Sequence, residues 1–431
     1  MKNKILYNYF FILFSIIPVS IIVGPAISLI NILLIDLSFI FLIIYTKDFY
    51  FLKNKTVKLL LFLYLYLIFN SLVSQNFSIG AARNLGFIRF IILFVAFNYF
   101  FNENKFFNKF LMIWALVIFV VCLDVYLESY TGENMLGYRQ ALYGKGTRIF
   151  SFFKDEPIVG GYINSFYLII TGYFYFIFKG YSKEYKILFL IISILLLLSI
   201  ILSGERSNTI KAFISFFIFY YLNKNFSIKT KIISFVLIII LFTSIFFSSY
   251  YLKMRYIDQT INKIDSKEKI IDVYNNFLYF RIYESGLELF KDYPLFGVGN
   301  KNYRLENRCA NGYEIETLVG AASEIKSSYW ICQTHPHQTY IEFLSEHGVI
   351  GSIILLVILF KLIFSKVKII LKSENYLQLG CVMYLSIIFI PVLPSGSFFS
   401  DYNLTLFWLN LSILYASNPT TNIFNKSKFQ D

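Results

Sequence analysis

The sequence predicts an all-α, polytopic membrane protein of about twelve transmembrane helices, with one large loop on the outward side. Three observations predict this class. Hydrophobic residues make up 57% of the 431 residues, whereas soluble domains average about 45–50%. Segments such as 187–202 and 232–247 carry almost no charge, and about 20 apolar residues cross a hydrocarbon core of about 30 Å. Finally, the lysines of the short segments between spans fall on one side of the membrane.

The predicted spans follow the apolar segments of the chain. They lie near residues 5–23, 26–46, 57–73, 84–102, 106–128, 158–178, 185–202, 207–222, 231–251, 345–364, 376–394 and 403–417. The first apolar run is long and no A-x-A-like cleavage site precedes Pro25, so we expect an uncleaved first span. Residues 1–251 then hold helices 1–9 with a minor periplasmic loop near 129–157. Residues 252–344 form the large periplasmic loop, and residues 345–431 hold helices 10–12 and a cytoplasmic tail.

Lysines occur in seven segments that this threading places on a single side. They are Lys2, Lys4, Lys47, Lys53, Lys55, Lys58, Lys105, Lys109, Lys179, Lys183, Lys186, Lys224, Lys229, Lys231, Lys361, Lys366, Lys368, Lys372, Lys426 and Lys428. The positive-inside rule makes that side cytoplasmic, so we expect both termini inside a bacterial inner membrane. The net charge of +13 does not indicate a nucleic-acid partner, because the basic residues lie in short runs rather than on one patch.

All nine arginines fall on the outer side of this threading or in the outer half of a span. The guanidinium group matches a phosphate with two parallel hydrogen bonds, which an ammonium group cannot do. Arg89 lies one to two turns inside a span, where it is either a functional charge or a side chain that snorkels to the interface. We expect Arg139, Arg255, Arg304 and Arg308 to be loop charges paired with nearby acids.

The three histidines, His335, His337 and His347, all lie within thirteen residues. Pro336 fits the first turn of a helix capped by Thr334 or His335, which would place His337 within that turn. The positive end of a helix disfavours imidazolium, so a neutral His337 could accept a proton there. The free N–H groups of the same turn favour an anion.

Two carboxylates follow these histidines. Glu342 and Glu346 are four residues apart and are expected to share a helix face with His335 and Gln338. Gly348 and Gly351 allow a bend before the next apolar stretch, and His347 is interpreted as an anchor at the membrane interface. The H-x-H spacing lacks the H-E-x-x-H pattern that brings two rings to one face, so no metal site is predicted.

Three stretches of the sequence resemble the O-antigen ligase and O-antigen polymerase family. The first runs from His335 to Gly351 (HPHQTY, then EHGVIG) and is similar to H-x-H-N followed by E-x-G-x-x-G, with Gln338 replacing the usual Asn. The second is residues 203–207 (SGERS), at a tight outer turn between two spans. The third is residues 280–299 in the large loop, which begin FRIYESG and end PLFGVG.

This resemblance implies a GT-C-like helical bundle and a glycosyltransferase that needs no cofactor or metal. Its implied donor is a glycan on undecaprenyl diphosphate, moved at the periplasmic face to an acceptor glycan, lipid A core or protein. In the family the histidine matching His337 is catalytic, and arginines matching Arg206 and Arg281 bind the diphosphate; Arg89 is a third candidate. Such a reaction needs stabilisation of the departing anion and a base for the hydroxyl. Ligase and polymerase share these motifs, so both activities stay open.

Four cysteines complete the set of candidate residues. Cys309 and Cys332 lie in the large outer loop, where a disulfide is chemically permitted. Such a bridge would stabilise the fold by about 3 kcal/mol in the chain-entropy model and would tether the segment before His335; the bridged and free forms both stay open. Cys122 and Cys381 lie in predicted spans and are interpreted as small apolar fillers.

Two other classes of membrane protein are alternatives to the transferase. A flippase for the same lipid-linked oligosaccharide would act without catalysis, but transporters commonly show inverted repeats and paired broken helices, and neither is found. A zinc-dependent protease or lipid hydrolase would need better ligand spacing. A large one-sided loop that carries every histidine favours chemistry at the membrane surface.

Overall fold

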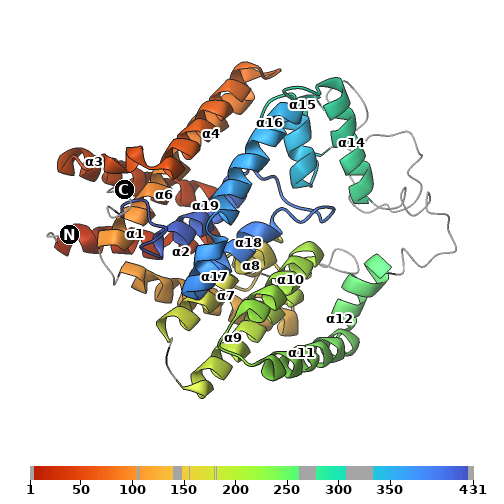
Figure 1. Cartoon of the computed structure of the whole chain (residues 1–431). Helices are drawn as coiled ribbons and strands as arrows, with labels where there is room; N and C mark the ends of the chain where they lie inside the picture. The colour runs from red at the N-terminus through yellow and green to blue at the C-terminus, as the bar shows by residue number, and fades with distance from the viewer. Residues whose placement is uncertain are drawn as a thin grey trace.

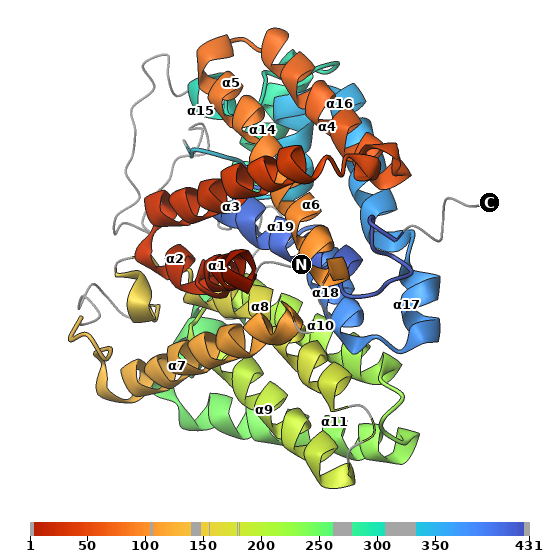
Figure 2. The same cartoon turned by 90° about the vertical axis from the view of Figure 1, so that its left-hand side faces the viewer.

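The computed structural model describes residues 4–103, 107–138, 148–154, 156–178, 180, 182–261, 278–306 and 333–425, and all regular elements in these ranges are helices. The N-terminal part contains α1 (Lys4–Ser15), α2 (Ile17–Val23), α3 (Pro25–Thr46), α4 (Lys55–Leu72), α5 (Phe77–Gly86), α6 (Ile88–Glu103) and α7 (Phe110–Thr131). Short 3₁₀ turns precede α4 and α7 at Tyr50–Lys53 and Phe107–Lys109. Figure 2 shows α1 and α2 between α3 and α7.

The middle of the chain adds α8 (Val159–Ile177), α9 (Lys183–Leu202), α10 (Arg206–Leu222), α11 (Ile228–Ser248) and α12 (Tyr250–Leu252), followed by a π-helical segment, Lys253–Ile261. A 3₁₀ turn, Ser151–Phe153, comes just before α8. The C-terminal part consists of α14 (Leu278–Asp292), α15 (Tyr303–Glu306), α16 (Thr339–Phe364), α17 (Val367–Ser373), α18 (Tyr376–Ile387) and α19 (Asp401–Ala416). In Figure 1, α14 and α15 lie together with the first turns of α16 at one edge of the molecule.

Two helices, α8 and α18, form the centre of the bundle (Figure 1). A Cβ atom at Gly172 of α8 would overlap the backbone of Tyr376, and one at Gly380 of α18 would overlap the backbone of Leu168. Glycine at both positions therefore lets the two backbones approach closely, as small residues do between membrane helices. α8 is buried on nearly every side and includes the polar Asn164 and Thr171.

The fold is that of a polytopic membrane protein, but the count of twelve spans is not confirmed. Seven helical segments are long and apolar enough to cross a membrane, and the pair α1–α2, bent by 43°, would make eight. Among the described helices, α8, α10, α18 and α19 fall short of that length or hydropathy. Most side chains of α8, α18 and α19 are buried, and a helix enclosed by other helices has no need of a long apolar surface.

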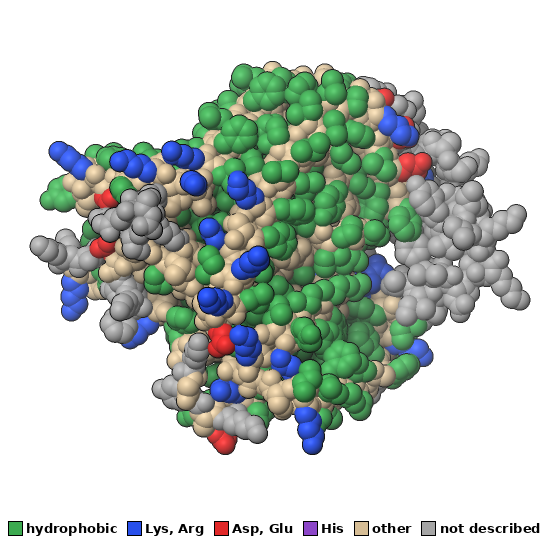
Figure 3. All heavy atoms as spheres, viewed as in Figure 1, with side chains coloured by type: hydrophobic (Ala, Val, Ile, Leu, Met, Phe, Trp, Pro, Cys, Tyr) green, Lys and Arg blue, Asp and Glu red, His purple; other side chains and the backbone are tan. Residues whose placement is uncertain are grey.

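The surface supports a membrane environment. Hydrophobic side chains cover most of the face in Figure 3, whereas Lys and Arg gather toward the left and lower left. Large exposed apolar residues recur along the outer faces of α3, α9 and α11. Continuous apolar areas of this size are rare on soluble monomers and indicate contact with lipid.

Two breaks in the helices shape the region of the histidines. α16 is kinked at Gly348, which has a positive φ of 64°, so the bend expected from the glycines is confirmed. α18 ends at Ile387, several residues before the predicted end of that span at 394. Pro391 and Pro394 have no N–H to donate, and residues 388–400 form an irregular segment, the 388–400 loop, that leads into α19.

Candidate functional site

The histidine segment enters α16 in a different way from that predicted. Gln338 is the N-cap, and its side-chain oxygen accepts from the N–H of Ile341 at 2.9 Å. The helix therefore begins at Thr339, and the prediction of a cap at Thr334 or His335 with His337 in the first turn is wrong. His337 has a φ of 53°, in the left-handed region that non-glycine residues rarely occupy, and such strain is often found at functional sites.

The imidazole rings of His335 and His337, which precede α16, lie against each other. The ring centroids of His335 and His337 are 3.9 Å apart, and the ring of Tyr279 on α14 lies 6.0 Å from that of His337. The N–H of Ser395, from the 388–400 loop, donates to the carbonyl of His337 at 2.8 Å. This bond fixes the backbone of His337 in its left-handed conformation.

The protonation of both histidines follows from this environment. Burial is the main cause that lowers the pKa of His337 to about 4, and the neighbouring His335 lowers it further. Burial also lowers the pKa of His335 to about 4, with a smaller contribution from Lys301. Both rings are therefore neutral at pH 7 and can accept a proton. The expected neutral state of His337 is confirmed, although burial rather than the helix dipole produces it.

Three arginines meet at the turn between α9 and α10. The N–H of Ile149, next to Arg148, donates to the carbonyl of Ser203 at 3.3 Å, and the Nε of Arg255 donates to the carbonyl of Gly204 at 3.0 Å. Arg206 begins α10 at the same turn. Arg255 is therefore buried at this turn and does not lie in a solvated loop.

The positive charges of this cluster act on one another and on the histidine. Burial lowers the pKa of Arg255 to about 10, and Arg148 and Arg206 lower it further. The charge of Arg148 also contributes to the low pKa of His337. The cluster and the ring are linked by hydrogen bonds: Ser207, the residue after Arg206, donates to the carbonyl of Pro394, and the next residue, Ser395, donates to the carbonyl of His337. A concentration of guanidinium groups beside a neutral imidazole is suited to an anion with several oxygens.

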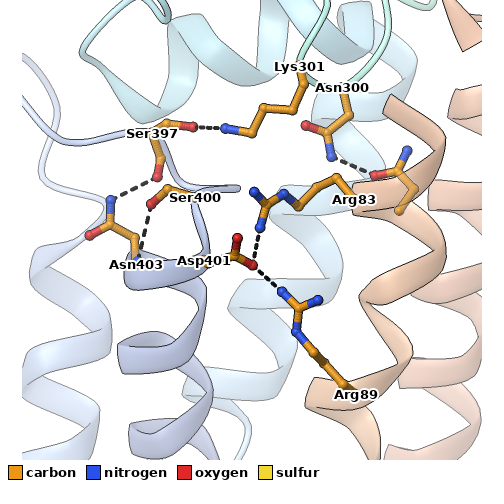
Figure 4. Close-up of polar contacts among 9 residues, drawn as sticks. Arg83, Arg89, Asn300, Lys301, Ser397, Ser400, Asp401 and Asn403 are labelled. Atoms are coloured by element: carbon orange, nitrogen blue, oxygen red, sulfur yellow. Dashed lines mark hydrogen bonds and ion pairs between the residues drawn. The ribbon is translucent and has the colours of Figure 1, made fainter. Parts of the chain in front are cut away.

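The other two predicted diphosphate ligands occupy different places. Arg281 lies on α14, two residues after Tyr279, so its helix borders the ring of His337. Arg89 of α6 forms an ion pair with Asp401 at the start of α19, and Arg83 of α5 pairs with the same carboxylate (Figure 4). Arg206 thus lies in the arginine cluster, whereas Arg89 belongs to a separate charged group.

The two residues predicted as supporting carboxylates are buried; Glu342 binds a neighbouring segment through its carboxylate, and Glu346 does so through its backbone carbonyl. Glu342 accepts from the Oγ of Ser397 at 2.6 Å and from the N–H of Phe398 at 2.8 Å. Lys301 in turn donates to Ser397 at 2.7 Å (Figure 4). The carbonyl of Glu346 accepts from the N–H of Gly299 at 2.9 Å. Because His335 precedes the helix, it does not share their helix face as predicted.

The glycines of two sequence motifs lie against each other. A Cβ at Gly297 would overlap the backbone of Glu346 and His347, and one at Gly348 would overlap the backbone of Leu295. Between them, the N–H of Val349 donates to the carbonyl of Pro294 at 2.8 Å. The segment PLFGVG therefore docks into the kink of EHGVIG through backbone hydrogen bonds, and a side chain at either glycine would separate them.

A comparison with protein families agrees with this geometry. Residues 191–356 match the family model described as O-antigen ligase. Over this segment the chain is similar to the O-antigen ligase family. No curated protein matches the chain. The resemblance stated from the motifs is thus confirmed, and the matched segment runs from α9 through Arg206, Arg281 and His337 into α16.

Several residues near the O-antigen ligase segment were not found from the sequence. The 388–400 loop, which contacts His337 through Ser395 and Glu342 through Ser397, lies outside the matched residues. Its two prolines and its serines were signals of a break in the predicted span. Arg148 and Tyr279 were not singled out, because nothing in their sequence context distinguishes them from other loop and helix residues.

The interpretation of His347 as an anchor at the membrane interface is wrong. His347 is fully buried rather than at an interface, and its Nδ1 lies 3.0 Å from the hydroxyl of Tyr66 on α4. The kink at Gly348 turns this side of α16 toward α4, which a straight interfacial helix would not do. His347 therefore has a structural role.

The remaining candidates fall in two groups. Cys309, Cys332, Arg139 and Arg308 lie outside the described residues. Cys122 and Cys381 are buried within the bundle, as expected for small apolar fillers. Within the described ranges no three His, Cys, Asp or Glu side chains are placed to hold a metal ion.

Proposed function

We propose that the protein transfers a glycan from an undecaprenyl diphosphate carrier to an acceptor hydroxyl, as an O-antigen polymerase or ligase. The observation that carries this proposal is the hydrogen-bonded link between the arginine turn and His337, in which Ser207 donates to Pro394 and Ser395 donates to His337; burial keeps the ring of His337 neutral there. The family match agrees with glycan transfer in O-antigen assembly. The lysine pattern supports placing the site on the periplasmic side of the inner membrane, with both termini in the cytoplasm.

In this mechanism the arginines stabilise the leaving group. The bond between the anomeric carbon and the diphosphate oxygen breaks, and both electrons of that bond stay with the diphosphate. Arg206 and Arg281 bind the resulting anion, and Arg148 and Arg255 strengthen the positive field around it. Donors that are already oriented before the reaction stabilise developing charge without a cost of reorganisation.

The acceptor forms the new bond to the anomeric carbon. Its hydroxyl oxygen forms the new bond to that carbon while its proton passes to the ring of His337. A buried, neutral imidazole can accept this proton at pH 7. The Ser395 hydrogen bond and the strained backbone of His337 keep the ring in place during the transfer.

A complementation experiment tests the assignment. A strain that lacks the gene would receive either wild-type protein, His337→Ala or His347→Gln, each with membrane insertion confirmed by blotting. We expect His337→Ala to lose glycan transfer, seen as single repeats or as unligated carrier-linked chains on a gel of surface glycans. His347→Gln, a matched change at a structural histidine, should keep transfer wherever the protein is stable. Unchanged glycans with His337→Ala would contradict the proposed role.

The same strain separates the two activities. Single-repeat products in the deletion strain indicate a polymerase, whereas long chains that remain on the carrier indicate a ligase. Both outcomes are compatible with the site, because the bonds formed and broken are the same.

A further inference from the structure

The segment that follows Arg148 is bound to α7 by two buried carboxylates. Asp124 and Glu128 lie four residues apart on α7 and so share one helix face, and the two residues are 0% and 2% exposed. The N–H groups of Phe150 and Ser151 donate to the two carboxylate oxygens of Glu128 at 3.1 and 2.6 Å. The hydroxyl of Ser151 donates to Asp124 at 2.5 Å. We call these two carboxylates the α7 clamp.

The residue at the centre of the α7 clamp has a strained backbone. Ser151 is fully buried and has a φ of 52°, in the left-handed region that non-glycine residues rarely occupy. The side-chain amide of Asn134 donates to its carbonyl at 2.5 Å, and the N–H of Met135 donates to the other oxygen of Asp124 at 2.6 Å. Such strain persists only where surrounding contacts over-determine the conformation, and here these hydrogen bonds do so.

The clamped segment lies directly beside the turn that carries Arg206. Ile149, between Arg148 and the clamped residues, is fully buried, and its N–H donates to the carbonyl of Ser203 at 3.3 Å. Burial lowers the pKa of Arg206 and that of Arg255, and the charge of Arg148 lowers both further. The backbone next to Arg148 is therefore held in a fixed place at the arginine turn.

The guanidinium of Arg148 differs from those of the arginines that have structural partners. Arg83 and Arg89 both pair with Asp401. Within the described residues, by contrast, the side chain of Arg148 forms no ion pair or hydrogen bond, and the residue is only partly buried. A guanidinium on a fixed backbone, with its N–H groups available, is suited to bind an anion through two parallel hydrogen bonds.

We propose that Arg148 is a further ligand of the donor diphosphate, and that Asp124 and Glu128 are positioning residues that act on the donor through Arg148. This inference rests on the proposed transferase function. All three residues lie outside residues 191–356, so the family match does not imply their roles. A diphosphate has more oxygens than two arginines can bind, so it can accept from a third guanidinium as well.

Binding of the carrier tests the inference without any transfer reaction. The probe is radiolabelled undecaprenyl diphosphate, titrated against the full chain in lipid nanodiscs. The variants are Arg148→Lys, Arg148→Ala, Glu128→Gln and the double variant that combines Arg148→Ala with Glu128→Gln. Lys154→Gln is the matched control, because it removes one positive charge from the same loop at an exposed residue.

We expect Arg148→Lys to raise the Kd for undecaprenyl diphosphate about tenfold, because an ammonium group cannot replace the bidentate fork. Arg148→Ala should weaken binding at least as much. Lys154→Gln should leave the Kd within about twofold of wild type, since exposed charges contribute little. These three results separate a direct ligand from the general positive field of the loop.

The double variant tests whether the α7 clamp acts through Arg148. Glu128→Gln should raise the Kd about fivefold in the wild-type chain, because its amide nitrogen cannot accept the second N–H. In the Arg148→Ala background the same change should have no further effect. This non-additivity is the property of a residue that acts through another, whereas a general loss of stability would weaken binding in both backgrounds alike.

Ser151→Gly tests the inference even where the carboxylate variants fold poorly. Glycine adopts a φ of 52° without strain, so the relief of strain offsets the lost hydrogen bond to Asp124. The melting temperature should stay within about 3 °C of wild type. The Kd for undecaprenyl diphosphate should nevertheless rise about threefold, because the backbone beside Arg148 is less fixed.

Three results would overturn the inference and leave the proposed function intact, provided that His337→Ala is inactive. They are an unchanged Kd in Arg148→Lys, an equal effect of Glu128→Gln in both backgrounds, and a loss in Lys154→Gln as large as that in Arg148→Ala. A failure of the proposed function looks different. His337→Ala would then transfer glycan as wild type does, or the wild-type protein would show no saturable binding of undecaprenyl diphosphate.

Discussion

The pH dependence of transfer tests the environment of His337 directly. Burial and the neighbouring His335 lower the pKa of His337 to about 4, so the base stays neutral well below pH 6. At pH 5.5 a base with a pKa of about 4 is about 97% neutral, whereas an imidazole with the ordinary value of about 6.5 is about 9% neutral. We therefore expect kcat/KM to be level from pH 8 to about 5.5. With a histidine of ordinary pKa, kcat/KM at pH 5.5 would already be about tenfold lower than at pH 8.

The assay measures initial rates of glycan transfer in nanodiscs across this pH range, with intrinsic fluorescence confirming that the protein stays folded. Since kcat/KM reports the free enzyme, its acid limb should lie below pH 5. His335→Gln removes the second-largest cause of the lowered pKa, so the acid limb of that variant should move to higher pH. A midpoint near pH 6.5 in folded wild-type protein would refute the reasoning.

Three further predictions concern single side chains. Arg206→Lys should lower kcat/KM at least tenfold because an ammonium group cannot replace a bidentate fork, and donor-dependence kinetics with Arg304→Lys as control would show it. Gly132→Ala, at a glycine with a positive φ and open space around it, should lower the melting temperature in detergent by roughly 2 °C. Gly348→Ala should lower it by at least twice as much, because its Cβ would also overlap the backbone of Leu295. Tyr66→Phe leaves buried His347 without its partner hydroxyl and should destabilise by about 1–3 kcal/mol, measured by chemical denaturation against Tyr64→Phe, whose hydroxyl bonds at the surface.

Backbone conformations that a single residue or a short apolar run determines were predicted from the sequence. The kink of α16 follows from Gly348, because few other residues adopt a positive φ. The turn at residues 203–205 follows from Gly204, which has a φ of 75°. Long apolar runs such as α9 and α11 became helices within a few residues of their predicted ends. In each case the residue itself sets the backbone conformation.

Features that depend on distant contacts were not predicted. The left-handed conformation of His337 is stabilised by Ser395, which lies 58 residues further along the chain. Hydropathy predicted α8 and α18 as membrane spans, but hydropathy alone does not distinguish burial within the protein from exposure to lipid, so the burial of these two helices was not predicted. The pairing of Arg89 with Asp401, 312 residues apart, likewise requires the fold. Sequence patterns record which groups are present but not which distant groups they meet.

A short chain of hydrogen bonds links His337 to the arginine helix α10. Ser207, the residue after Arg206, donates from its Oγ to the carbonyl of Pro394 at 2.5 Å, and the buried Lys211 of the same helix donates to that carbonyl at 3.3 Å. The next residue of the loop, Ser395, donates to the carbonyl of His337. Any shift of α10 therefore moves the loop and with it His337. The proposed transfer between two bound substrates needs its groups held to within about 0.5 Å, and the coupling of the arginine helix to the proposed base through Pro394 and Ser395 would provide that constraint.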